Sequence, residues 1–122
     1  MSSEGLHESE STLQPETVDR HRAISSLMEE LEAVDWYDQR IDATADPELQ
    51  AILRHNRDEE KEHAAMVLEW LRRRDPVLDG HLRQYLFSTG SIVGMEADGD
   101  RDNGSEGPAG LAIGALRDKE GL

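Results

Sequence analysis

The amino-acid sequence predicts an all-α fold, in which an antiparallel two-helix hairpin and a short third helix form one subunit and two subunits dimerise into a four-helix bundle. Two long stretches carry apolar residues at alternating spacings of four and three, the pattern of a helix with one buried face. No stretch shows the period-two alternation of a β-strand. The apolar faces of the two helices form a seam, and a single hairpin covers only half of it. A second hairpin is therefore expected to cover the other half.

The first helix is predicted from Pro15 to about Ala43, after a polar segment, residues 1–14, that we expect to be frayed. Proline suits the first helical position because its missing N–H would have no partner there, and Glu16 complements the positive end of the helix. Glu30 lies inside the first of two apolar stripes along this helix. The stripes consist of Ala23, Leu27, Val34, Tyr37 and Ile41 and, beside them, of Ile24, Met28 and Leu31.

The second helix is predicted from the start signal Asp46-Pro47-Glu48 to about Arg74, where Asp75-Pro76 ends it. The short link of Thr44 and Ala45 makes the first two helices antiparallel. Three polar side chains, Asn56, Glu60 and His63, interrupt the otherwise apolar seam of this helix at predicted buried positions. The seam reads Leu49, Leu53, Asn56, Glu60, His63, Val67 and Trp70.

A shorter helix is predicted from Val77 to Phe87, with Leu78, Leu82, Tyr85 and Leu86 on one face. Eight of the ten glycines follow residue 89, and residues 90–109 are too polar to offset the entropy of ordering them. The predicted organisation is therefore a folded domain over residues 15–89, a disordered acidic linker over 90–109, a short apolar strip over 110–117 and a tail over 118–122.

The composition excludes several classes of function. A formal net charge of −14 on 122 residues argues against binding to nucleic acid or to anionic membrane surfaces. The absence of cysteine excludes disulfides, thiolate zinc sites and iron–sulfur clusters. No apolar run approaches the roughly 20 residues of a membrane-spanning helix, and residues 1–10 lack the pattern of a signal peptide, so we expect a cytoplasmic protein.

The strongest candidate site is the set of polar residues at seam positions, Glu30, Glu60 and His63. A buried, unpaired carboxylate costs several kcal/mol, so facing carboxylates need a cation or a proton. Glu60 and His63 are one helical turn apart and can reach the same ion, and this ligand set suits iron, manganese or zinc. Two copies of the chain would supply the four carboxylates and two imidazoles of a di-iron centre in a four-helix bundle. The alternative is a Glu–His pair at a dimer seam without metal.

Other residues carry weaker signals. Tyr37 lies on the stripe of Glu30 and is either a neighbour of the metals or a core aromatic residue. Trp36 is expected to pack, and Glu29 and Glu32 either capture incoming Fe²⁺ or form a solvated face. The remaining candidates are expected to lie at the surface; they are His21, His55, His81, Glu59 and Glu62.

Several segments of the sequence together resemble the encapsulated ferritin family. They read EELEAVDWY over residues 29–37, HNRDEEKEHA over 55–64, LEWLRR over 68–73 and YLF over 85–87. The resemblance implies a half-ferritin subunit that dimerises into a ferritin-like bundle and carries a di-iron ferroxidase centre at the subunit interface. On this sequence the ligands implied are Glu30, Glu60 and His63 from each chain, with Tyr37 and Trp36 beside the metals.

The same resemblance implies further properties of the site and the assembly. Glu29 and Glu32 match an acidic site that draws metal toward the centre, and calcium, manganese or zinc can substitute for the two irons. Dimers are expected to assemble into a ring, typically a decamer, that is the cargo of an encapsulin shell, where the iron is stored.

The apolar strip GLAIGALR over residues 110–117 resembles the peptide that directs cargo into an encapsulin shell. Leu111, Ile113, Gly114 and Leu116 are the residues expected to bind the shell protein.

The function implied is oxidation of Fe(II) to Fe(III) by dioxygen, inside an encapsulin nanocompartment of a prokaryotic cytoplasm. The alternatives left open are a metal-binding module without catalysis and a structural cargo module.

Overall fold

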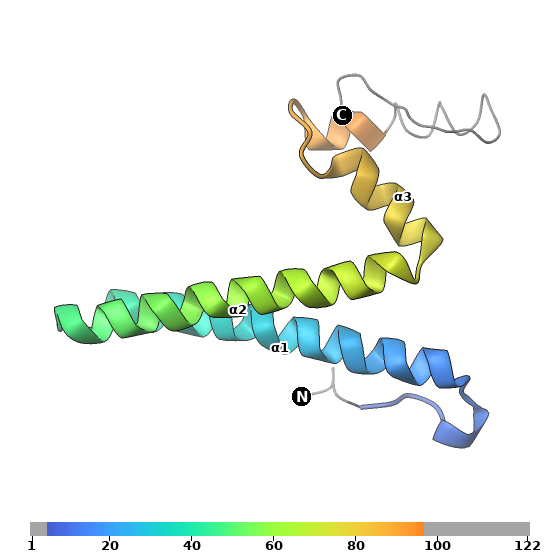
Figure 1. Ribbon diagram of the computed structural model, residues 1–122, viewed down its shortest axis with the longest axis horizontal. Helices are drawn as coiled ribbons and strands as arrows, with labels where there is room; N and C mark the ends of the chain where they lie inside the picture. Colours follow the sequence, from blue (N-terminus) through green and yellow to red (C-terminus); the bar gives the residue numbers. More distant parts are fainter. Residues whose placement is uncertain (1–4, 97–122) are drawn as a thin grey trace. The chain divides into compact units, whose positions relative to one another are not determined.

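The computed structural model describes residues 5–96, whose α-helices are drawn in Figure 1. In chain order the elements are the 3₁₀ helix η2 (Glu10–Thr12) and the α-helices α1 (Pro15–Ala43), α2 (Pro47–Arg73) and α3 (Pro76–Tyr85). The chain divides between Arg74 and Asp75 into two compact units. The predicted all-α class and the long antiparallel hairpin are confirmed. No helix in residues 5–96 is both long and apolar enough to cross a lipid bilayer.

In the first unit, α1 and α2 run side by side in opposite directions, as Figure 1 shows in blue to cyan and in green. The turn between them is held by the side chain of Gln50. Its amide Nε2 donates hydrogen bonds to the carbonyl oxygens of Ile41, at 3.2 Å, and Thr44, at 2.7 Å. Carbonyl groups at the end of a helix have no partner within the helix, so Gln50 replaces the bonds that the end of α1 lacks.

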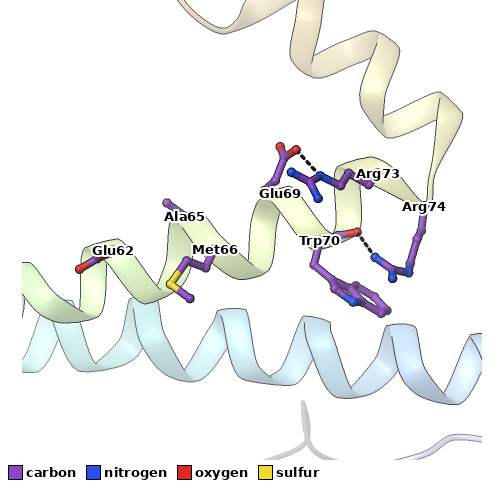
Figure 2. Close-up of a pocket in the computed structure, with 7 residues that line it drawn as sticks. All are labelled: Glu62, Ala65, Met66, Glu69, Trp70, Arg73 and Arg74. Carbon is purple, nitrogen blue, oxygen red and sulfur yellow. Dashed lines mark hydrogen bonds and ion pairs between the residues drawn. The ribbon is translucent and has the colours of Figure 1, made fainter.

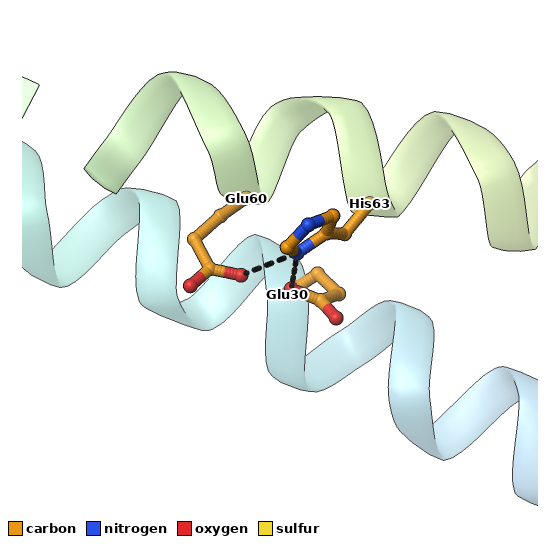
Figure 3. Close-up of side chains that lie close together, drawn as sticks. All are labelled: Glu30, Glu60 and His63. Carbon is orange, nitrogen blue, oxygen red and sulfur yellow. Dashed lines mark hydrogen bonds and ion pairs between the residues drawn. The ribbon is translucent and has the colours of Figure 1, made fainter. Parts of the chain in front are cut away.

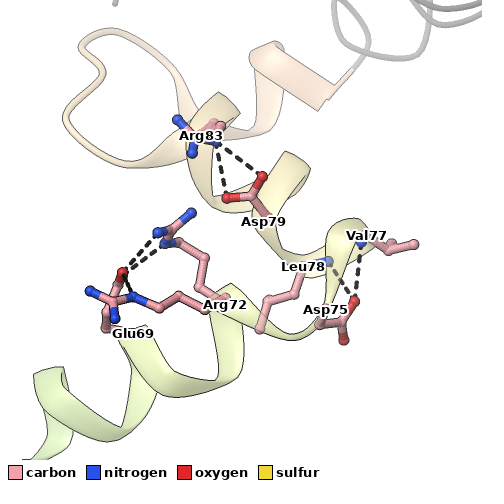
Figure 4. A network of polar contacts seen from close by, with 8 residues as sticks. Glu69, Arg72, Asp75, Val77, Leu78, Asp79 and Arg83 are labelled. Atoms are coloured by element: carbon pink, nitrogen blue, oxygen red, sulfur yellow. Dashed lines mark hydrogen bonds and ion pairs between the residues drawn. The ribbon is translucent and has the colours of Figure 1, made fainter.

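Local signals fix both ends of α2. Asp46 caps the start, because its Oδ1 accepts a hydrogen bond from the backbone N–H of Glu48 at 3.0 Å, and Pro47 occupies the first helical position. Near the end, Glu69 accepts hydrogen bonds at 2.7 Å from both Arg72 and Arg73 (Figure 4). These two cations also face the negative end of the helix dipole.

The hydrophobic core of this hairpin is thin. Among the described residues only Ile41, Ala64 and Leu71 are buried, and each keeps 5–7% of its surface exposed. The predicted first stripe of α1 is buried at Ile41 and half-buried elsewhere, whereas Ile24, Met28 and Leu31 of the second stripe are exposed, Leu31 by 54%. On α2 the most buried face is rotated by about one residue from the predicted face, since Ala64 and Leu71 are more deeply buried than their neighbours His63 and Trp70.

The second unit contains α3, which begins one residue earlier and ends two residues earlier than predicted. Asp75 caps it by accepting hydrogen bonds from the N–H groups of Val77, at 3.1 Å, and Leu78, at 3.0 Å (Figure 4). The helix cannot continue to Phe87, because that residue has a φ of 62°, in the left-handed region.

Part of the predicted linker lies within the described residues. Residues 92–96 are helical, and the Gln84 amide donates a hydrogen bond to the backbone oxygen of Met95 at 2.6 Å. The rest of the linker, the apolar strip over 110–117 and the tail lie outside the described residues. In the N-terminal segment that we expected to be frayed, the Thr12 hydroxyl donates to the Ser9 carbonyl oxygen at 2.7 Å and supports η2.

Candidate metal centre

The structure brings the three candidate ligands together across the hairpin. Glu30 projects from α1, and Glu60 and His63 project from α2 toward it (Figure 3). One ligand atom of each residue lies within 4.8 Å of those of the other two. Because the residues come from two helices, the register of α1 against α2 determines whether the site exists.

The imidazole of His63 lies between carboxylates on both sides. Its Nδ1 is 3.4 Å from Oε1 of Glu60 and 3.7 Å from Oε1 of Glu30. Its Nε2 is 3.9 Å from Oε1 of Glu59. The nitrogen that faces the two seam glutamates is therefore Nδ1, which identifies the ring atom available to an ion held by all three residues.

The protonation of the two seam glutamates is linked. The hydrogen-bonded carboxyl of Glu60 raises the pKa of Glu30, and burial and the negative charge of Glu60 act in the same direction. The same hydrogen bond lowers the pKa of Glu60, and His63 lowers it further. Protonation of the pair is therefore favoured at Glu30. A divalent cation would relieve the same repulsion.

The pKa of His63 is set by opposing effects. Burial lowers this pKa, but the hydrogen bond with Glu60 and the negative charges of Glu30, Glu60 and Glu59 outweigh it, so the pKa is raised. The acidic surroundings thus favour a positive charge at the imidazole. A metal ion bound at Nδ1 would supply that charge in place of a proton.

The site is open on one side. The side chains of Glu30 and Glu60 are each 25% exposed, and that of His63 is 45% exposed. These residues are less buried than the seam positions predicted, since a single hairpin leaves them partly in contact with solvent. Three ligands on a half-open surface form an incomplete coordination sphere for a transition metal, and open positions remain for further ligands.

The other predicted site residues lie along α1 and have different contacts. The guanidinium of Arg40 lies 5.5 Å from the ring centroid of Tyr37 and 6.0 Å from that of Trp36. Tyr37 is half-buried and Trp36 is exposed. Glu29 is exposed, and Glu32 is half-buried. The cluster of His63 with Glu30 and Glu60 is therefore the part of the predicted site that the structure assembles.

Two features near the site were missed by sequence reasoning. Glu59 is exposed, as predicted, and its carboxylate also lies 3.9 Å from the second ring nitrogen of His63, a contact that was not predicted. Arg57 joins the two helices, because its Nη1 donates a hydrogen bond to Oδ1 of Asp38 at 2.9 Å. The spacing of Glu59 and His63, one turn apart on a helix, could have indicated the first contact. No sequence pattern identified Asp38 as the partner of Arg57.

The hairpin also carries an open groove of about 520 Å³ that contains none of the candidate ligands (Figure 2). There the guanidinium of Arg74 stacks 4.1 Å from the ring centroid of Trp70 and donates a hydrogen bond to the Trp70 carbonyl oxygen. These contacts stabilise the last turn of α2. The lining residues are Glu62, Ala65, Met66, Glu69, Trp70, Arg73 and Arg74.

Residues 5–89 match the EncFtn-like family, and this stretch includes both helices of the site. The chain is similar to the encapsulated ferritin-like protein of Rhodospirillum rubrum, with 56% identity over 131 residues, covering 99% of this chain and 94% of the relative. It is also similar to a ferritin-like protein of Thermotoga maritima, with 50% identity over 104 residues, covering 85% and 90% of the two chains.

Two further relatives extend the comparison. An encapsulin nanocompartment cargo protein of Myxococcus xanthus, named EncC, is 35% identical over 100 residues, covering 72% of this chain and 76% of the relative. A crystal structure of a Nitrosomonas europaea protein superposes with a TM-score of 0.70 at 61% identity, covering 72% of this chain and 97% of that chain.

Proposed function

Because this chain belongs to the EncFtn-like family, we propose that it is a ferroxidase, which oxidises Fe(II) to Fe(III) with dioxygen at the cluster of Glu30, Glu60 and His63. The observation that carries this proposal is the convergence of two carboxylates and one imidazole, from two helices, within 4.8 Å. Iron is the substrate of the reaction, and the protein contributes the ligands and their fixed geometry.

The chemistry of the three residues suits this reaction. Carboxylate oxygens bind a trivalent iron ion more strongly than a divalent one, because the attraction grows with charge. Oxidation therefore becomes more favourable at a site with two glutamates, while Nδ1 of His63 supplies a neutral ligand. Each Fe(II) gives one electron, and dioxygen accepts the electrons.

A second copy of the chain would complete the site. One chain provides only three ligands, and they are partly exposed, whereas the di-iron centre of a four-helix bundle uses four carboxylates and two imidazoles. Next to Glu30 on α1, the apolar side chains of Met28 and Leu31 are exposed. An exposed apolar strip is unfavourable in water and is typical of an interface between helices. The proposed dimer would therefore pair two hairpins across this strip. A ring of such dimers, a decamer, is part of the same proposal.

Residues of α1 are proposed to assist the centre. Tyr37 and Trp36 would lie beside the metals, and Glu29 and Glu32 would attract Fe²⁺ from solution toward them. The exposure of Glu29 and the partial burial of Glu32 are compatible with capture of a hydrated cation.

We further propose that the protein works as the cargo of an encapsulin shell, where Fe(III) is stored. The support is the similarity to a cargo protein of an encapsulin nanocompartment. The apolar strip over residues 110–117, with Leu111, Ile113, Gly114 and Leu116, would bind the shell protein. It lies outside the described residues.

The test of the proposed reaction is anaerobic loading with Fe(II) followed by addition of O₂, with Fe(III) absorbance as the readout. Wild type is expected to oxidise iron rapidly, and Glu60→Ala and His63→Ala are expected to lose the rapid phase. Glu48→Gln, which removes a glutamate charge at the start of α2, is the matched control and should keep it. Binding of Fe(II) without turnover would favour a metal-binding module, and no binding would favour a structural cargo module.

A further inference from the structure

We infer that Arg57 is a positioning residue, whose hydrogen bond to Asp38 holds α1 and α2 in the register that brings Glu30 to Glu60 and His63. This inference rests on the proposed function only in assuming that these three residues bind a metal ion. It concerns a residue that is not itself a ligand.

The geometry gives Arg57 a partner on each helix. Its Nη1 donates to Oδ1 of Asp38 on α1 at 2.9 Å, and its Nε donates to Oδ1 of Asp58 on α2 at 3.1 Å. The planar guanidinium presents several N–H groups in a fixed arrangement, so two carboxylates restrict its position better than one. The Arg57 side chain is only 23% exposed, which limits its freedom further.

The hydrogen bond between Arg57 and Asp38 lies next to the metal cluster, on the side of the hairpin turn. Arg57 precedes Glu60 by three residues, which places it one helical turn away on the same side of α2. Asp38 follows the half-buried Tyr37 on α1. The contact thus lies on the stretch of hairpin between the metal cluster and the turn at residues 44–46, where Gln50 already fixes the two helix ends.

Without a bound metal ion, the two glutamates oppose close approach of the helices. Glu30 and Glu60 bring two carboxyl groups from opposite helices within 4.8 Å, and two negative charges this close are unfavourable unless a proton or a cation lies between them. The apolar core that could oppose separation of the helices is small, since Ile41, Ala64 and Leu71 are the only buried residues of the described part of the chain. A directional link one turn away would counter the repulsion and keep the ligands together before the metal arrives.

Such an arrangement makes a specific prediction about affinity. Without the hydrogen bond between Arg57 and Asp38, the two helices can separate or rotate before metal binds. Metal binding must then restore the ligand geometry, which lowers the affinity. Loss of a residue that orients metal ligands typically weakens binding by a factor of ten to one hundred. We expect about a tenfold loss for Arg57, which acts on the helices and not directly on a ligand.

The experiment is titration of the intact protein with Co(II), followed by the visible absorption of the bound ion. Arg57→Gln and Asp38→Asn are each expected to weaken binding about tenfold and to change the absorption spectrum, because the ligand geometry relaxes. The double variant should lose no more than either single variant, since both remove the same contact. Arg57→Lys keeps the charge with a single donor group and should give an intermediate affinity.

The control is Arg22→Gln, which removes an arginine–aspartate pair of similar kind, Arg22 with Asp19 at 2.7 Å, within one helix. It should leave Co(II) affinity unchanged. Unchanged affinity and spectrum in Arg57→Gln and Asp38→Asn, or additive losses in the double variant, would overturn the inference. If wild type itself fails to bind Co(II), the assumption of a metal site fails instead. Circular dichroism identifies any unfolded variant, in which case the Asp38 substitution provides the test.

Discussion

Replacing Glu60 with glutamine should separate a metal ligand from a structural residue. The substitution keeps the size and the hydrogen-bonding capacity of the side chain but removes its negative charge. In the metal-free protein two effects oppose each other: the pairing with His63 at 3.4 Å weakens, and the repulsion between Glu60 and Glu30 disappears. We therefore expect little change in the melting temperature of the metal-free protein.

The metal-bound protein should behave differently. A dication about 2 Å from a carboxylate gains about 4 kcal/mol from one negative charge even at the dielectric constant of water, part of which desolvation removes. We take about 2.7 kcal/mol as the net loss, which corresponds to a hundredfold weaker affinity. At a Co(II) concentration of about one hundred times the wild-type Kd, wild type gains about 2.7 kcal/mol of stability and the variant gains about 0.4 kcal/mol.

Thermal unfolding at one fixed protein concentration measures this difference. For a domain of this size the gap of about 2.3 kcal/mol corresponds to roughly 9–18 °C in the Co(II)-induced shift of Tm. Glu48→Gln should show the wild-type shift. An equal Co(II)-induced gain in Glu60→Gln and wild type would show that Glu60 is not a metal ligand. A substitution that lowers the Tm of the metal-free protein as much as that of the metal-bound protein would show that Glu60 is a structural residue.

Two further predictions concern the scaffold. Gln50→Ala removes the hydrogen bonds that the side chain donates to the carbonyl oxygens of Ile41 and Thr44. Urea unfolding should show that the hairpin is destabilised by about 1–3 kcal/mol. An unchanged unfolding midpoint would mean that water satisfies both carbonyl groups. Arg72 and Arg73 hold the pKa of Glu69 at about 2, below its ordinary value of 4.5, so its contribution to stability is present above pH 4.5 and is lost as the pH falls toward about 2. The stability difference between wild type and Glu69→Gln should therefore shrink over that range, and a difference that is constant with pH would contradict the assignment.

The helix boundaries were largely predictable because the signals that set them are local. Asp46 and Pro47 start α2 at the predicted residue, and Pro15 starts α1, since proline and a capping carboxylate act on neighbouring backbone groups. The end of α3 was predicted two residues too late. The left-handed backbone of Phe87 depends on the path of the following chain, which no pattern in the helix specifies.

From the sequence alone, helical periodicity placed Glu30, Glu60 and His63 on the inner faces of their helices, which made a shared metal site a reasonable hypothesis. Their convergence at one point was not predictable in this way, because it depends on the register of α1 against α2. The partial exposure of that face, the choice of Nδ1 on His63, and the link of Arg57 to Asp38 were decided only by the tertiary structure. Periodicity fixes the direction of a side chain around its own helix. The rotation and sliding of one helix against another depend on contacts between residues far apart in the chain, which a single sequence does not reveal.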